Sequence, residues 1–533
     1  MKIFLMPYEE KYHFSSKDLR YINEDPTLQP FYKYKPEIPS FTEVIQDKKI
    51  EFISDKRKLL KAVLIKQYSE MPEDDLAKMQ VERLGNENTF TVTTAHQPCL
   101  MTGPLYVIYK AISTINLARK LNLNYPDFHF VPMFISGGED HDLEETNHFH
   151  LFGKKIQWKT EQTGPVGRME TEGINEILQA IEQMSGNSPF SSQLNSLLND
   201  AYKNASNYGA FFRNILAKLF HETGLLILNM DEKVLKKAAI PIFRDELIKH
   251  SSQIIVNQTQ EELEKIGFGQ QAYAREINLF YFHENKRLRI EREADNFAIV
   301  DSDIKFSEAE ILSLLEKHPE RFSPNVVIRP LYQEALLPNL AYVGGGGEIS
   351  YWLERKRQFE HFNINFPVLL RRNTVFWLDH ICSKSLNQLS LETIDIFDDL
   401  DQLINSFVLK EAEEEISLNE EKQQLAVIFK HIAEKANQLE ASIYKTIKAE
   451  EAKHQKSIDH LEHKLLKAKK QQLEVSLNKL RKTHSKIFPN SKPQERFDNF
   501  IMYYLRLGPN FIEVLMEHLD PFSKEIILFQ EED

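Results

Sequence analysis

Three carboxylates and a histidine stand together in the short segment GGEDHD, residues 137–142. The carboxylates of Glu139, Asp140 and Asp142 flank His141 directly after an apolar stretch. Such side chains can hold an amine or a hydroxyl, accept its proton, or bind a metal ion. The structural alternative is an acidic loop in which Asp142 caps the next helix. We expect a site with Asp140 and His141 as catalytic residues and Glu139 in binding. We expect no metal, because no second His or Cys lies at ligand spacing.

A run of four glycines separates two apolar stretches in AYVGGGGEI (341–349); these are Gly344, Gly345, Gly346 and Gly347. Such a run exposes backbone N–H groups and lets a ligand approach closely, as phosphate and carboxylate cradles require. A flexible turn is the structural alternative, but it would cost conformational entropy in a chain with only 18 glycines. We expect the glycines to bind an anion and Glu348, at the start of the next helix, to meet a cationic group of the ligand.

His96 and Gln97 follow a β-branched stretch, and a loop with Thr102, Gly103 and Pro104 leads from them into a helix. The N-terminus of a helix offers free N–H groups and a positive dipole end to an anion. We therefore expect His96 to be catalytic and the other four residues to shape a binding site. The alternative is that His96, as a lone histidine, is structural.

Two arginines could pair with a carboxylate or a phosphate: Arg329, in NVVIRPLYQ, and Arg371, after PVLL. For Arg371, a solvated position at a strand end is an equal alternative. The chain has no GxxxxGK[ST], which excludes a P-loop. Ser383-Lys384-Ser385 resembles the Lys-Ser loop of class I synthetases, but a plain helix start explains three residues better.

The elements that must position these residues alternate between strand and helix. TFTVTTA (89–95) predicts a strand buried on both faces, the apolar stripe after Pro104 predicts a helix, and FHFVPMFIS (128–136) predicts a second strand. This order forms a βαβ unit and hence a parallel sheet. Ligands bind beyond the carboxyl ends of such strands, so the His96 loop and the segment 137–142 should meet there.

The α/β rhythm is interrupted over residues 151–320, which we interpret as an inserted α+β module with a meander of short strands at 277–301. GLLILN (224–229) could belong to this module or to the core sheet. The sheet pattern resumes with predicted strands at 325–333 and 366–378. The expected division is an N-terminal arm and first part of the core at 1–150, then the module, then the second part of the core at 321–384.

A long helical region follows at 385–490. It has no glycine or proline before Pro489, and its apolar residues recur in steps of three and four, which indicates a coiled coil. The pattern weakens over KAEEAKHQKS (448–457), so we predict two antiparallel helices that meet there. The tail, 491–533, reads as amphipathic helix with the strand-like end IILFQ.

Composition narrows the class of protein. A chain of 533 residues with 42% hydrophobic and 27% charged residues is a soluble protein of several domains. Its formal charge of −13 disfavours binding to nucleic acid or anionic membranes. Cys99 and Cys382 are too few for a disulfide framework and suit a reducing compartment. The N-terminus lacks the pattern of a signal peptide, and no window approaches the ~20 apolar residues of a membrane helix. We expect a cytoplasmic location.

The chain resembles the bacillithiol biosynthesis cysteine-adding enzyme family, a family of cysteine ligases. The resemblance rests on four motifs that occur in the family's order and spacing: TAHQPCLMTGPLYVIYKAIS, SGGEDHDLEETNH, VVIRPLYQEALLPNLAYVGGGGEISYW and IFPNSKPQERFDN. Together they span most of the chain. Ala95 departs from the family pattern, in which this position usually carries glycine.

The resemblance implies a Rossmann-like core similar to class I nucleotidyltransferases and a homodimer through the coiled coil. It also implies addition of L-cysteine to the amine of glucosaminyl-malate, the last step to bacillithiol. Because amide formation in water needs an activated carboxyl, a nucleotide such as ATP is expected by analogy. Two alternatives stay open: an adenylate-forming ligase for another amine, and a non-catalytic coiled-coil scaffold with a vestigial core.

Overall fold

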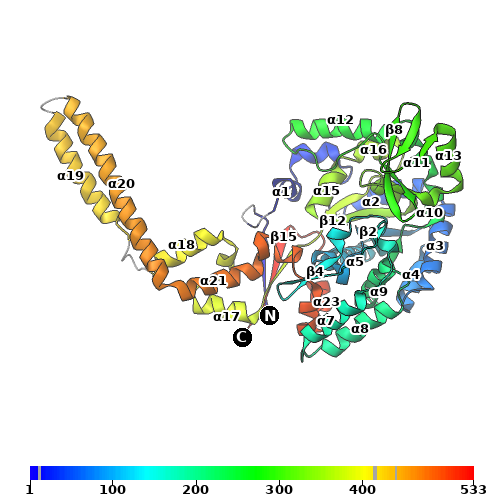
Figure 1. Ribbon diagram of the computed structural model, residues 1–533, viewed down its shortest axis with the longest axis horizontal. Helices are drawn as coiled ribbons and strands as arrows, with labels where there is room; N and C mark the ends of the chain where they lie inside the picture. The colour runs from blue at the N-terminus through cyan, green and yellow to red at the C-terminus, as the bar shows by residue number, and fades with distance from the viewer. Residues whose placement is uncertain (10–11, 13, 412–416, 438–440, 533) are drawn as a thin grey trace.

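The computed structural model of the chain describes residues 1–9, 12, 14–411, 417–437 and 441–532. Figure 1 shows a globular body from which a helical arm projects, with both chain termini at the base of the arm. The body holds a five-stranded parallel sheet and a five-stranded antiparallel sheet, and a three-stranded sheet joins the body to the arm.

The central sheet is parallel throughout, with its strands in the order β13-β12-β2-β3-β6. The strands are β2 (Thr89–His96), β3 (His129–Ser136), β6 (Leu226–Asn229), β12 (Asn339–Gly344) and β13 (Val368–Arg371). Numbered along the chain and read from β6, this is the order 3-2-1-4-5 of a doubly wound, Rossmann-like sheet. The predicted parallel core is confirmed, and 224–229 contributes a strand to it. The order reverses between β2 and β12, so a crevice opens at the carboxyl ends of these two strands.

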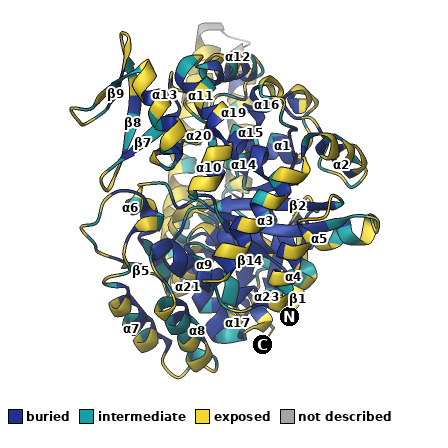
Figure 2. Ribbon diagram, turned by 90° about the vertical axis from the view of Figure 1, so that its right-hand side faces the viewer, coloured by how far each residue is buried: buried dark blue, intermediate teal, exposed yellow. Residues whose placement is uncertain are grey.

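Helices cover both faces of this sheet, as Figure 2 shows by the dark, buried strands among helices with exposed outer sides. The α-helices that precede β6 in the chain are α1 (Ser16–Ile22), α2 (Ser40–Glu51), α3 (Ser54–Tyr68), α4 (Asp75–Arg83), α5 (Tyr106–Asn124), α6 (Leu143–Thr146), α7 (Ile174–Ser185), α8 (Ser191–Lys203) and α9 (Tyr208–Leu219). Met133 of β3 packs in the core with α3, whereas Phe134 packs in the core with α5 and α9. Burial on both sides explains why β3 is apolar without alternation.

The antiparallel sheet confirms the predicted meander, and its strand order is β10-β9-β8-β7-β11. Its strands are β7 (Leu279–His283), β8 (Lys286–Glu293), β9 (Asn296–Ile299), β10 (Lys305–Ser307) and β11 (Phe322–Pro324). The helices beside it are α10 (Lys233–Ala238), α11 (Ile240–Ile248), α12 (Ser251–Lys265) and α13 (Glu308–Lys317). Earlier in the chain, β4 (His148–Leu151) and β5 (Lys154–Gln157) form a separate hairpin.

Two predicted strands are wrong. Residues 325–333 lead into a helix, α14 (Arg329–Leu336), because Pro330 stands in its first turn, where a missing N–H costs nothing. Residues 366–378 form two strands, since after β13 the chain leaves the central sheet and begins β14 (Val375–Leu378). β14 pairs with the C-terminal strand β15 (Glu525–Gln530), which in turn pairs with the N-terminal strand β1 (Lys2–Pro7).

Between the switch point and the arm, the chain forms α15 (Gly346–Leu353), α16 (Lys356–His361) and α17 (His380–Gln388). The helices of the arm are α18 (Leu400–Glu411), α19 (Asn419–Asn437), α20 (Ala441–Gln472) and α21 (Glu474–Ile487). After the arm, α22 (Phe500–Leu507) and α23 (Asn510–His518) return to the body.

The two long arm helices lie antiparallel. Lys422 near the start of α19 pairs with Glu462 of α20 at 2.7 Å, and further along α19 the ring of Phe429 lies 5.6 Å from that of His454. The turn between them was expected at 448–457, which is wrong, because α20 runs through these residues without a break. Exposed polar residues with good helix propensity weaken the apolar pattern without ending a helix. Residues 412–416 and 438–440 of the expected coiled coil lie outside the described residues.

Glu334 of α14 is fully buried beside the central sheet, where its Oε1 accepts hydrogen bonds from Gln333 and Asn339, each at 2.8 Å. Burial raises the pKa of Glu334 to about 7. Because the pKa is higher in the folded chain than in the unfolded chain, folding favours the protonated Glu334 carboxyl. Its contribution to the free energy of unfolding is complete below pH ~4.5 and is lost as the pH rises through 7.

Glu334→Gln keeps the accepting oxygen and removes the charge. Relative to the wild type, we expect the variant to gain about 2 to 3 kcal/mol of unfolding free energy between pH 5 and pH 8. Urea unfolding of both proteins across this range measures the difference, and a gap that does not change with pH would contradict it.

Candidate functional site

A cavity of about 670 Å³ lies at the carboxyl edge of the central sheet. All five parallel strands end at it and contribute residues at or just after their last position: His96, Ser136, Met230, Gly345 and Arg372. Phe280 and Arg287 of the antiparallel sheet form the opposite wall. The cavity is therefore built where a doubly wound sheet binds ligands.

Most of the predicted site residues line this cavity: His96, Gln97, Glu139, Asp140, His141, Arg329, Gly345, Gly347 and Glu348. The other predicted residues are not among those lining it: Thr102, Gly103, Pro104, Gly344, Gly346 and Arg371. Each of these exceptions has a structural role elsewhere.

Asp140 and His141 share an arginine that the sequence did not reveal. Arg287 of β8 lies 3.3 Å from Asp140 Oδ1 and 3.3 Å from His141 Nδ1. Its guanidinium stacks on the Phe280 ring at 3.9 Å and donates to Ser323 Oγ at 3.0 Å. Burial and the nearby arginine lower the pKa of His141, so its imidazole is neutral at neutral pH and can accept a proton.

His96 is held at the end of β2 by two hydrogen bonds. Its Nδ1 lies 2.9 Å from the Gln97 carbonyl, which can only accept, so Nδ1 carries the proton and Nε2 accepts from the Tyr106 hydroxyl at 3.0 Å. Burial, and then the charge of Lys110, lower the pKa of His96 to about 4. His96 therefore stays neutral. Cys99 is buried nearby, and burial raises its pKa to about 12, so its thiol stays protonated at neutral pH.

Lys110 of α5 is a buried cation of the cavity. Its Nζ pairs with Glu348 at 2.7 Å and donates to the Ala95 carbonyl at 2.6 Å. Glu348 also accepts from the Tyr342 hydroxyl at 2.7 Å and from the Gly345 N–H at 2.9 Å. Burial raises the pKa of Glu348, but Lys110 and these donors outweigh it and hold that pKa at about 2. The expected partner cation of Glu348 is thus part of the chain and not of a ligand.

Two of the four glycines in the run are required by packing. None of its four residues has a positive φ. Gly346 is needed because a Cβ there would lie 2.1 Å from the Asp18 side chain, and at Gly344 a Cβ would crowd the Tyr342 ring at 3.0 Å. Gly345 and Gly347 line the cavity, so only half of the predicted anion cradle faces it.

The turn before α5 faces the C-terminal part of the chain. Thr102 and Gly103 have positive φ values of 64° and 68°, and the Gly103 carbonyl accepts from Asn499 at 2.6 Å. A Cβ on Gly103 would lie 2.9 Å from the Cβ of Cys99. Thr102, Gly103 and Pro104 thus shape the entry to the helix, and their predicted contact with a ligand is not supported.

Arg371, the arginine expected to bind an anion, lies outside the cavity, and its neighbour Arg372 lines the cavity instead. Arg371 pairs with Asp18 at 3.0 Å and lies outside the cavity. Arg372 lines the cavity, and its Nε is buried without a hydrogen-bond partner among the described residues. Neighbouring side chains at a strand end point to opposite sides, so a shift of one residue moves the arginine from one side to the other.

Further charges surround the cavity. Arg329 donates to the Tyr351 hydroxyl at 2.7 Å, and its neighbours raise the pKa of its guanidinium. Glu139 pairs with Lys236, which also pairs with Asp231 at 3.0 Å. Although burial raises it, Lys236 and Arg168 hold the pKa of Asp231 at about 2. Glu139 and Asp231 are therefore paired with cations of the chain itself.

Sequence reasoning missed several residues that line the cavity: Tyr106, Lys110, Asp231, Arg287, Tyr351 and Arg496. Lys110 is the one with a local signal, because it lies among apolar residues on a face of the helix that the pattern predicts to be buried. No local signal marks Arg287 or Arg496, because charged residues surround both in the sequence.

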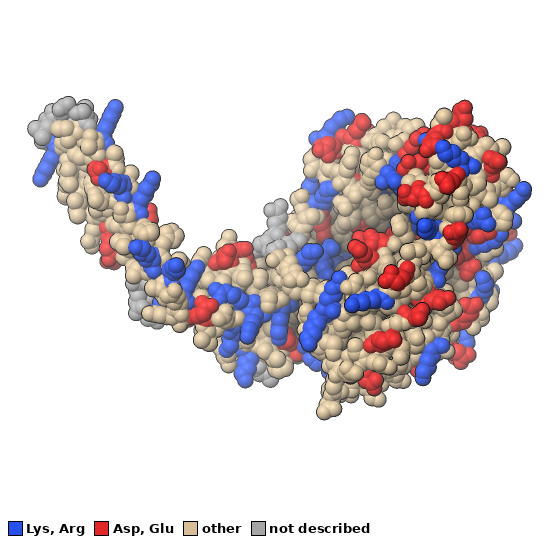
Figure 3. Space-filling model, in the orientation of Figure 1, with Lys and Arg blue, Asp and Glu red and all other residues tan. Residues whose placement is uncertain are grey.

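Two general properties of the described residues bear on function. They contain no cluster of three or more His, Cys, Asp and Glu side chains placed to hold a metal ion, and no helix among them is long and apolar enough to cross a membrane. Figure 3 shows acidic and basic side chains interspersed over the visible face of the body, so this face offers no uniformly basic surface to a polyanion.

Two family models match the chain. Residues 1–373 match the N-terminal Rossmann-like domain of bacillithiol biosynthesis BshC, and residues 377–531 match its C-terminal coiled-coil domain. A protein of Flavobacterium johnsoniae is 40% identical over 516 residues, which are 97% of both chains. One of Cytophaga hutchinsonii is 34% identical over 97% of both, and one of Bacillus cereus is 28% identical over 94% of this chain and 95% of its own. All three carry the name "Putative cysteine ligase BshC".

Proposed function

The chain belongs to the bacillithiol biosynthesis BshC family, and on this premise we propose that it is a ligase that joins the carboxyl group of L-cysteine to the amine of glucosaminyl-malate. The observation that carries the proposal is the cavity, with proton acceptors Asp140 and His141 on one side and a set of cations on the other. An amide ligase for an anionic amine substrate needs both a general base and fixed positive charge.

The base side would act on the attacking amine. The amine nitrogen attacks the carbonyl carbon of the activated cysteine, a C–N bond forms, and the bond to the leaving group breaks. The proton released by the amine passes to Asp140 or to neutral His141. Arg287, 3.3 Å from both, would hold the carboxylate in place and stabilise its charge before the transfer.

The cationic side would bind anions. Lys110, Arg329, Arg372 and Arg496 fit the malyl carboxylates of the substrate or the phosphates of a nucleotide. The unpartnered Nε of Arg372 supports this fit, because a buried donor without a partner is costly and a ligand oxygen would satisfy it. A nucleotide such as ATP, when bound, would supply the activation of the cysteine carboxyl.

Incubation of the purified chain with cysteine, glucosaminyl-malate and ATP tests the proposal. Mass spectrometry should detect a thiol whose mass is the sum of the two substrates less one water, and omission of ATP should abolish it. A product formed with another amine, and none with glucosaminyl-malate, would favour the broader adenylate-forming alternative. A folded chain that forms no product with any nucleoside triphosphate would favour the non-catalytic scaffold. We expect the reaction to be cytoplasmic, where Cys99 and Cys382 would stay reduced.

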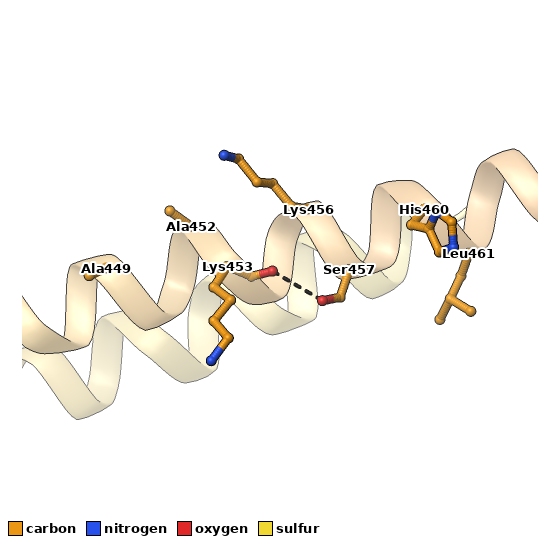
Figure 4. A pocket seen from close by; sticks show the side chains of 7 residues that line it. All are labelled: Ala449, Ala452, Lys453, Lys456, Ser457, His460 and Leu461. Atoms are coloured by element: carbon orange, nitrogen blue, oxygen red, sulfur yellow. Dashed lines mark hydrogen bonds between the residues drawn. The ribbon is translucent and has the colours of Figure 1, made fainter.

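The arm is the proposed contact of a homodimer. A hollow of about 690 Å³ lies along α20. Figure 4 shows the side chains that line it, among them the small residues Ala449, Ala452 and Ser457 and the apolar Leu461. Among the described residues, only those of α20 line this hollow, which suits a packed helix better than a small ligand. Several apolar side chains of the arm are exposed: Val427, Ile428, Ile432, Leu461 and Leu465. Light scattering should therefore give twice the mass of the chain, 62.4 kDa, and Leu461→Asp should shift it toward the monomer. A monomeric wild type would contradict the dimer.

A further inference from the structure

The segment that leaves the coiled coil lies beside the cavity. After α21 ends at Ile487, the chain passes through short 3-10 turns at Pro489–Ser491 and Gln494–Arg496 and then enters α22. We refer to residues 494–499 as the strap. Arg496 of the strap lines the cavity, although the sequence separates it from the other cavity residues by the whole arm.

The strap holds the arginine at the end of β13. Glu495 forms a bidentate pair with Arg372, with distances of 2.7 Å to Nη1 and 2.6 Å to Nη2. The Glu495 side chain is 1% exposed and that of Arg372 is 2% exposed, so the pair is shielded from water. Because both terminal nitrogens are held, the guanidinium plane is fixed, and the buried Nε–H has no hydrogen-bond partner among the described residues.

The strap also holds the start of α5. Asn499 donates to the Met101 carbonyl at 2.7 Å and to that of Gly103 at 2.6 Å, and the Asp498 carbonyl accepts from the Leu105 N–H at 2.8 Å. Tyr106, the next residue, donates to His96 and lies under the Arg372 guanidinium at 5.4 Å. The strap therefore fixes two walls of the cavity at once.

We propose that the strap is part of the anion subsite, with Glu495 as a positioning residue that orients Arg372 and Arg496 as a direct contact for a ligand carboxylate or phosphate. This inference rests on the proposed function, since it deepens the role of the same cavity. The arm completes the site, because the strap is the direct continuation of α21.

Two probes, L-malate and ATP, are titrated calorimetrically into the full-length wild type and the variants Glu495→Gln and Arg496→Gln. We expect each variant to weaken the binding of at least one probe about tenfold or more, because each alters a charged contact. With glucosaminyl-malate as substrate, KM should rise while kcat changes less. Lys492→Gln is the matched control, because it removes an exposed cation two residues before Gln494. It should bind as the wild type does.

The double variant Arg372→Gln with Glu495→Gln shows whether Glu495→Gln loses anion binding because Arg372 is no longer oriented or because the chain is less stable. It leaves no unpaired buried charge, so its thermal stability should exceed that of Glu495→Gln, yet anion binding should remain lost. Recovery of binding together with stability would overturn the positioning role of Glu495. Wild-type affinity in Arg496→Gln would overturn its direct contact. If ATP bound in a way that depends on the strap but malate did not bind, this inference would stand. The proposed function would then have to place the malyl group of the substrate outside this subsite. Binding of neither probe to the wild type would overturn both.

Discussion

Asp140→Asn should lower kcat by about two to four orders of magnitude, the usual contribution of a general base. The carboxylate accepts from the His141 N–H at 2.8 Å and pairs with Arg287 at 3.3 Å, both through Oδ1. The other oxygen is thereby available to the amine. An amide can keep the contacts of Oδ1 but cannot take a proton. Steady-state rates with all three substrates measure the effect, and KM for glucosaminyl-malate should change much less than kcat.

The matched control is Asp142→Asn, two residues along the same loop. Asp142 caps α6 by accepting from the Glu145 N–H, and it does not line the cavity. Asparagine caps a helix about as well as aspartate, so turnover should stay near that of the wild type. If Asp140→Asn were as active as Asp142→Asn, Asp140 would have no part in proton transfer and His141 would be the remaining candidate.

Lys110→Met should destabilise the chain by about 3 kcal/mol, because it leaves the part-buried Glu348 carboxylate without its ion-pair partner. The Lys110 side chain is 1% exposed and that of Glu348 is 24% exposed, so water can replace the lost contact only in part. Lys110 helps to hold the pKa of Glu348 at about 2. The contribution of this ion pair to the free energy of unfolding is therefore present above pH ~4.5 and is lost as the pH falls through 2. Urea unfolding at pH 7 measures the cost.

Two further variants define the cause. Lys120→Met removes a cation of the same helix that pairs with Asp520 at the surface, where such a pair contributes at most about 1 kcal/mol. Adding Glu348→Gln to Lys110→Met should restore much of the lost stability, because no unpaired charge then remains. Anion binding should stay impaired, since the cavity still lacks its cation. Equal destabilisation by Lys110→Met and Lys120→Met would contradict the buried ion pair.

The sequence located the strands β2 and β3 and the two loops at their carboxyl ends because the signals are local. β2 is a run rich in β-branched residues, β3 is mostly apolar, and polar loops follow both directly in the chain. His96, Asp140 and His141 could therefore be assigned to one sheet edge before any contact was known. Residues 325–333 misled the same reasoning, since a helix that begins at Pro330 is apolar enough to resemble a buried strand.

Arg371 and the glycines show why the finer prediction failed. Two adjacent arginines look alike in a sequence, and only the direction in which each leaves β13 assigns Arg372 to the cavity and Arg371 to Asp18. Gly346 must lack a Cβ because the side chain of Asp18 occupies that space, and Asp18 lies more than three hundred positions away in the chain. No local pattern carries such information.

The sequence by itself determined a parallel α/β core, a coiled coil and two of the loops that line the cavity, because these depend on the periodicity of apolar residues and on polar loops next to them. The tertiary structure alone decided which cations complete the cavity. Arg287, Arg372 and Arg496 come from the antiparallel sheet, the last parallel strand and the strap beyond the arm. Which arginine reaches the cavity depends on where tertiary packing places its backbone. Because these residues lie far apart in the sequence, the residues next to each of them carry no sign of the contact.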